Sequence, residues 1–171
     1  LDYYYEHSSV DLQKEAFRAQ LEIAARTGMP VQIHTRDADQ DTVQIMQEFK
    51  VIPHSSIGPI RLGMVRDEVR QILGEPSSVE AAHVKWDIHW PDRDSFFNNA
   101  FQVTYDSTGK AVHIEASANS SYTVTFDGVS VHDALPQVVI DTIGKYAAVD
   151  DQHSEYPVNL WFPALDVNLF R

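Results

Sequence analysis

The 171-residue sequence contains no cysteine and no long apolar run. The absence of cysteine excludes disulfide bonds, thiolate metal ligands and cysteine nucleophiles, so a metal would have to be held by histidine, aspartate or glutamate. No segment approaches the roughly 18 apolar residues of a membrane span, and the start "LDYYYEHSS" lacks the basic and apolar parts of a signal peptide. We therefore expect no membrane contact, with the cytoplasm as the default location.

Positive charge is also scarce, because 13 lysines and arginines face 25 aspartates and glutamates, a formal net charge of −12. A phosphate backbone needs a basic surface, so we expect nucleic acid to be a poor partner. A basic protein partner fits this charge better, although acidic residues also serve solubility alone. With 43% hydrophobic and 22% charged residues, the composition is that of a folded globular protein.

The first fifty residues predict the order helix, strand, helix. The stretch "SSVDLQKEAFRAQLEIAARTG" has near-helical apolar spacing, a serine at its head and Gly28 at its end, and Pro30 then separates it from the short strand "VQIH". "DADQDTVQIMQEFK" predicts a second helix with acids at its start. Its expected buried side chains are Val43, Ile45, Met46 and Phe49.

The composition changes at residues 51–60, "VIPHSSIGPI", which contain two prolines, two serines and a glycine. We predict this segment to be a linker between a domain at 1–50 and one at 61–171. The second domain is expected to be α+β: one helix in "RLGMVRDEVRQILGEP", another in "DALPQVVIDTIGKYA" with Asp133 as its cap, and an antiparallel sheet that both cover. The alternating stretches predicted as its strands are "HVKWDIHW", "AFQVTYD", "AVHIEASA", "YTVTFDG" and the two halves of "VNLWFPALDVNLF", with a turn at "DSTGK".

Residues 1–49 closely resemble the middle of the TatD-type metal-dependent deoxyribonucleases, in "LDYYY" and in "PVQIHTRDA". The resemblance implies a (β/α)-barrel fragment with metals at the C-terminal ends of strands. In that family the metals are held by an HxH pair, a glutamate, the histidine of the "IHxR" motif, a further histidine and a late aspartate. Only His34 falls on one of these positions.

One imidazole does not hold a catalytic divalent ion, for which about three protein ligands are usual. We therefore interpret His34 as a metal-ligand position inherited from that family. For the chain alone we predict no catalytic residue and no cofactor. A divalent metal is expected only if another chain, or ligands not recognised in the sequence, complete the site. His83, Asp87 and His89 lie on one face if "HVKWDIH" is a continuous strand, but they then span about 20 Å, too far for one ion.

Aromatic residues give two further hypotheses. "KWDIHWPDRDSFFNNAF" places Trp86, Trp90, Phe96 and Phe97 among acids, either as a protein-binding surface or as filling for the core. The run from Tyr3 to Tyr5 suits stacking on nucleobases, but it has no basic neighbours in sequence, so packing is its default role.

Residues 57–76 more weakly resemble the "LGMSxxEVxxLLGxP" opening of BamE and of β-lactamase-inhibitory proteins, which implies protein binding. Our leading hypothesis is accordingly a non-catalytic binding module of immunity or inhibitor type, carrying an incomplete TatD-like segment. The alternative is a TatD-type metal-dependent phosphodiesterase or deoxyribonuclease. A third hypothesis is a chimera joined near Lys50, in which residues 1–50 either dock as a helix–strand–helix appendage or are exchanged between two copies of the chain.

Overall fold

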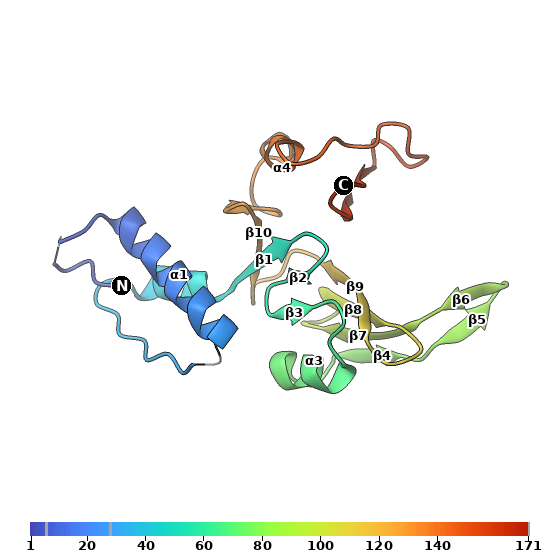
Figure 1. The fold of residues 1–171 in the computed structure, drawn as a ribbon, viewed down its shortest axis with the longest axis horizontal. Helices are drawn as coiled ribbons and strands as arrows, with labels where there is room; N and C mark the ends of the chain where they lie inside the picture. Colours follow the sequence, from blue (N-terminus) through green and yellow to red (C-terminus); the bar gives the residue numbers. More distant parts are fainter. Residues whose placement is uncertain (6, 28, 171) are drawn as a thin grey trace. The chain divides into compact units, whose positions relative to one another are not determined.

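The computed structural model describes residues 1–5, 7–27 and 29–170, and the chain divides into two compact units, Leu1–Glu48 and Phe49–Arg171. Within the described residues the chain is a mixed α/β protein with four helices and several sheets (Figure 1). Gly28, the expected C-cap, lies outside the described residues. None of the helices described is long and apolar enough to cross a membrane.

Two helices make up most of the first unit. The longer helix, α1 (Val10–Thr27), begins after Ser9, whose hydroxyl accepts a hydrogen bond from the amide of Leu12 at 3.4 Å. The shorter one, α2 (Asp39–Met46), packs against α1. The buried residues of this unit come from both helices and from the residue before α2. They are Phe17, Ala38, Thr42 and Ile45.

The structure corrects two expectations for this unit. The "VQIH" segment forms no strand in the described part of the chain; a single parallel bridge, between Asp2 and Arg36, follows it. The predicted apolar face of the second helix is only partly right. Ile45 is buried, but Val43 and Met46 are half exposed, because an eight-residue helix with one helical neighbour buries a narrow stripe.

Phe49 begins the second unit, in strand β1 (Glu48–Ile52) rather than in α2. Residues 51–60 continue into β2 (Ser56–Ile57) and β3 (Ile60–Arg61), so this segment is not a linker. Its glycine and prolines belong to tight turns: Gly58 has a φ of 57°, and a Cβ there would lie 2.5 Å from Cγ of Phe49. The three strands join β10 (Thr123–Phe126) and β11 (Val129–Ser130) in a sheet of order β11-β10-β1-β2-β3.

A four-stranded antiparallel sheet of order β4-β7-β8-β9 forms the larger core of the second unit. The predicted alternation is clear in β8, where every second residue is buried, and Val69 of helix α3 (Arg66–Leu73) packs with these buried side chains. The expected "DSTGK" turn is confirmed, because the Asp106 carboxylate accepts the amides of Thr108 and Lys110 at 2.8 and 3.0 Å. The strands are β4 (Ser78–Glu80), β7 (Asp92–Phe96), β8 (Phe101–Tyr105) and β9 (Ala111–Ala116).

Helix α4 (Pro136–Gly144) builds a second, smaller core in this unit. Its N-cap is Leu135 and not Asp133, whose carboxylate instead accepts the Ser130 hydroxyl at 2.8 Å. The strands around α4 pair in two antiparallel hairpins, the second joined near Pro163 as predicted. They are β10 (Thr123–Phe126), β11 (Val129–Ser130), β12 (Asn159–Phe162) and β13 (Val167–Phe170).

A buried carboxylate ties α3 to the four-stranded sheet. Asp94 is fully buried and receives a bidentate pair from Arg70, with nitrogen to oxygen distances of 2.8 and 3.0 Å. Arg66 lies 3.6 Å from the same carboxylate and stacks 4.4 Å above the ring of Tyr105. Burial, followed by the nearby Asp94 charge, raises the pKa of Tyr105 to about 12. This cluster of charged side chains connects α3 to the four-stranded sheet.

Replacing Asp94 with alanine is expected to lower the free energy of unfolding of the second unit by about 2–4 kcal/mol, because both arginines lose their buried counter-charge while keeping partial access to water. Denaturant unfolding of the whole chain measures this. The exposed Asp87, changed to asparagine, is the control and should shift stability by less than about 0.5 kcal/mol. Equal effects of the two substitutions would contradict a structural role for the Asp94 cluster.

Candidate functional site

The ends of two neighbouring extended segments lie side by side in the first unit. Asp2 pairs in parallel with Arg36, through a hydrogen bond from the Tyr3 amide to the Arg36 carbonyl at 2.9 Å and one from the Arg36 amide to the Leu1 carbonyl at 3.0 Å. Helix α1 connects the two segments, as a parallel pair requires. Side chains that follow the pairing therefore gather at one edge, the carboxyl ends of both segments.

Asp2 organises this edge. One oxygen of its carboxylate accepts the amides of Tyr4 and Tyr5 at 3.1 and 3.2 Å, which folds the chain back just after the pairing. The other oxygen lies 3.5 Å from Nη1 of Arg36. The same carboxylate therefore fixes both the loop that carries the tyrosines and the arginine that faces them.

The tyrosine rings and Arg36 form an exposed cluster. The guanidinium carbon of Arg36 lies 5.0 Å from the centre of the Tyr5 ring and 5.9 Å from that of Tyr4, within range of cation–π attraction. The two rings meet edge to face at 4.8 Å, and His7 stacks on Tyr5 at 5.8 Å. Tyr4 is 64% exposed and Tyr5 49%, so the cluster lies at the surface, with Arg36 and His7 both against the Tyr5 ring.

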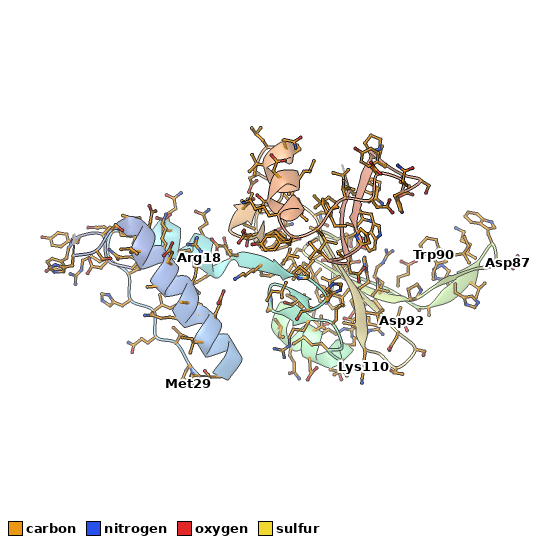
Figure 2. All side chains as sticks on the ribbon, turned by 45° about the horizontal axis from the view of Figure 1, so that its top comes forward. Arg18, Met29, Asp87, Trp90, Asp92 and Lys110 are labelled. Carbon is orange, nitrogen blue, oxygen red and sulfur yellow. The ribbon has the colours of Figure 1, made fainter. Side chains whose placement is uncertain are left out.

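Tyr3 is held differently from its two neighbours. Its hydroxyl donates to Asp41 of α2 at 2.8 Å, and Lys14 of α1 lies 2.6 Å from the same oxygen. Burial, with the hydrogen bond to Asp41, raises the pKa of Tyr3 to about 12, while the hydrogen bonds from Lys14 and Tyr3 lower the pKa of Asp41. Arg18 of α1, labelled in Figure 2, forms a bidentate ion pair with Glu48. Its Nε and Nη2 atoms lie 2.7 and 2.6 Å from the two carboxylate oxygens.

His34 lies two residues before Arg36 and is exposed; its carbonyl accepts a hydrogen bond from the Leu1 nitrogen at 3.3 Å. Within residues 1–5, 7–27 and 29–170, no three histidine, aspartate or glutamate side chains come together as ligands for a metal ion. The described residues alone therefore do not fit a catalytic divalent ion, and His34 stands as a single donor.

The four aromatic residues predicted for partner binding separate into two groups. Phe96 is only 1% exposed and lies in the core, and Phe97 packs half-buried against that core, so neither belongs to a binding surface. Trp86 and Trp90 are 81% and 41% exposed on a hairpin. Figure 2 shows Asp87 and Trp90 on this hairpin, which extends from the second unit beyond Asp92.

The hairpin also corrects the prediction of one strand over "HVKWDIHW". Its two arms are β5 (His83–Lys85) and β6 (Ile88–Trp90), paired antiparallel with His83 opposite Trp90. The reversal occurs at Trp86 and Asp87, whose φ angles of 52° and 60° are those of a two-residue hairpin turn. The single-face row of His83, Asp87 and His89 therefore does not exist.

Comparison with known proteins adds the family. The family model described as TatD related DNase matches residues 1–140. The chain belongs to this TatD-related family. No solved structure matches the chain.

Curated relatives match this TatD-related chain over short stretches. The uncharacterized metal-dependent hydrolase YabD of Bacillus subtilis is 46% identical over 48 residues, which are 28% of this chain and 19% of that protein. The uncharacterized metal-dependent hydrolase YcfH of Escherichia coli K12 is 43% identical over 51 residues, 30% of this chain and 19% of that protein. The chain thus spans about a fifth of the length of these relatives.

The family match runs through Lys50 and through residues 57–76. It therefore supports the TatD-type resemblance, and it gives no support to a chimera or to the resemblance with BamE. The immunity-type function likewise gains nothing from the comparisons. The sequence did not indicate the cluster of Tyr4, Tyr5 and Arg36. Arg36 lies 31 residues after Tyr5, and the two meet only through the parallel pairing.

Replacing Asp2 with alanine is expected to free the loop after the pairing, because the amides of Tyr4 and Tyr5 lose their shared acceptor. Hydrogen exchange at these two amides should be about fivefold faster, corresponding to about 1 kcal/mol for the lost hydrogen bonds. Asp39, exposed in the first turn of α2, is the matched control. Unchanged exchange in the Asp2 variant would show that the carboxylate does not hold the loop.

Proposed function

We propose that this TatD-related chain contributes part of the active site of a metal-dependent phosphodiesterase that acts on DNA. The observation that carries the proposal is the parallel bridge between Asp2 and Arg36, which joins two segments in parallel two residues after His34. Active sites of (β/α)-barrels are built at this edge of the strands. The family match and the metal-dependent hydrolases among the relatives support the same function.

The proposal requires ligands beyond those described. Catalytic metal sites usually take about three protein ligands, and His34 supplies one. The remaining ligands come from polypeptide outside this sequence or from another chain. In such an assembly the exposed side chains Val31 and Ile33, which are 43% and 38% accessible, become buried against neighbouring strands. Their exposure in the isolated unit agrees with a segment that lacks part of its surroundings.

The proposal is tested by complementation. The YabD relative is first assayed for metal-dependent cleavage of DNA, and then prepared without its 48-residue segment that matches this chain. Adding the complete 171-residue chain should restore metal-dependent cleavage. The His34→Ala variant should restore at most about a hundredth of it, in line with the loss of a ligand's contribution to metal affinity.

His89→Ala is the control in this experiment, since His89 is an exposed histidine of the second unit. It should restore cleavage as well as the unmodified chain does. Failure of the unmodified chain, or equal success of His34→Ala, would contradict the proposed contribution to a metal-dependent site.

The exposed β5–β6 hairpin favours protein binding as a second function. Trp86 and Trp90 are open to solvent, and Nζ of Lys85 already lies 4.4 Å from the centre of the Trp86 ring. The ring face therefore accepts a cation, and an acidic protein of net charge −12 attracts a basic partner. We propose a basic polypeptide as the occupant of this hairpin.

Polylysine is the probe for this second function. Trp86→Ala is expected to weaken its binding several-fold, as the loss of about 1 kcal/mol of cation–π energy implies. Titration calorimetry compares this variant with Tyr156→Ala, which removes another exposed ring of the second unit. If both variants bind polylysine like the unmodified chain, net charge alone attracts the polymer and the hairpin is not its site.

A further inference from the structure

The second unit contains a large cavity, of about 1140 Å³, lined by the turn after β1, by strands β9 and β13 and by helix α4. Ligand pockets commonly measure about 300–1,000 Å³, so a cavity of this size suits an elongated occupant. Exposed apolar side chains that gather in one place mark interaction sites. Four such side chains of the lining are between 38% and 78% exposed. They are Ile52, Leu62, Val112 and Phe170.

A hydrogen bond connects two loops beside this cavity. Nε2 of His54, in the turn between β1 and β2, donates to the carbonyl of Ala164, in the turn between β12 and β13, at 3.1 Å. The β12–β13 hairpin is thereby anchored next to the five-stranded sheet, and residues 166–170 all belong to the lining of the cavity.

Strand β13 has an unpaired edge. It pairs with β12 on one side, and no other strand joins this sheet in the described part of the chain. The Asn159 amide and the Trp161 carbonyl form hydrogen bonds of 3.0 and 2.8 Å with the loop that precedes β12, so both residues point away from β13. Their partners in the register, Phe170 and Asn168, therefore direct their amides and carbonyls to the free edge of β13.

The charged side chains of the lining are acidic. Glu115 of β9 and Asp166, next to β13, are both exposed, and the lining residues that the structure describes include no lysine or arginine. The histidines of the lining count as neutral at pH 7. Beyond Lys50 the sequence has eight basic and sixteen acidic residues, so the surroundings of the cavity also favour a cationic occupant.

We propose that this cavity binds an extended, basic segment of another protein, which adds as a strand to the free edge of β13. The backbone of the segment pairs with Asn168 and Phe170, and its apolar side chains, at every second position, cover the apolar lining. A lysine or arginine of the segment lies near Glu115 or Asp166. A third strand also stabilises the β12–β13 hairpin, since two strands alone are marginally stable. The inference is independent of the proposed hydrolase function and of the β5–β6 hairpin.

The experiment uses the full chain and a short dye-labelled peptide of alternating valine and lysine, with binding followed by fluorescence anisotropy. Asn168→Pro removes an amide of the free edge but no hydrogen bond to β12, and it should weaken binding about fivefold, the effect of one lost hydrogen bond. Glu115→Gln should weaken binding about threefold. Glu75→Gln, at an exposed glutamate of the second unit outside the cavity, is the control and should bind like the unmodified chain.

Two further measurements test the pairing through the backbone. The same peptide methylated on every backbone nitrogen keeps its side chains and charge but has no donors for a strand, so it should bind at least about tenfold more weakly. With saturating unmethylated peptide, the amides of Asn168 and Phe170 should exchange hydrogen about tenfold more slowly. The amide of Leu169 already faces β12 and should change less. The exchange result decides the question even if Asn168→Pro does not fold.

Equal binding of the unmodified and the methylated peptide would overturn the inference, because net charge alone would then attract the peptide. Equal binding of a peptide of alternating valine and glutamate would also overturn it. So would slow exchange at Asn168 that appears without peptide as the protein concentration rises, since a second copy of the chain would then occupy the edge.

Discussion

The arrangement of the first unit depends on one parallel contact, the pairing of Asp2 with Arg36. Two backbone hydrogen bonds, from Tyr3 to Arg36 and from Arg36 to Leu1, join segments that α1 separates by more than thirty residues. Because the contact is parallel, both segments end at the same edge, and everything that follows them is brought together there. Arg36 and the tyrosine loop share an environment only as long as this contact holds.

Much of the fold was predictable where local pattern and local structure coincide. The spacing of apolar residues gave α1, α3 and α4, and alternation with a turn signal gave the β8–β9 hairpin. The prediction was wrong where the same alternation of residues fits two different structures. "HVKWDIHW" alternates equally well as one strand or as two strands of a hairpin, and Trp86 is not a residue that sequence rules expect at a positive φ.

Long-range contacts could not be predicted from the sequence for a related reason. Phe96 and Trp86 both stand among acids, and only the register of β7 against β8 decides that Phe96 points into the core. Nothing in the sequence distinguishes Asp94 from the other 24 acidic residues, although burial beside Arg70 makes it a structural residue. The motif around His34 was recognisable because it is local, whereas the meeting of Arg36 with Tyr4 and Tyr5 depends on a contact across α1.

The two strongest observations concern the first unit: membership of the TatD-related family and an exposed aromatic and cationic cluster that includes Arg36, two residues after His34 in the sequence. Both depend on the parallel pairing, so a direct test of the pairing tests the account most directly. In a parallel pair of this register, the amide proton of Arg36 and the α-proton of Asp2 are close neighbours. Nuclear Overhauser spectroscopy of the labelled chain should show this cross-peak, and a well-resolved spectrum without it would contradict the arrangement of the site.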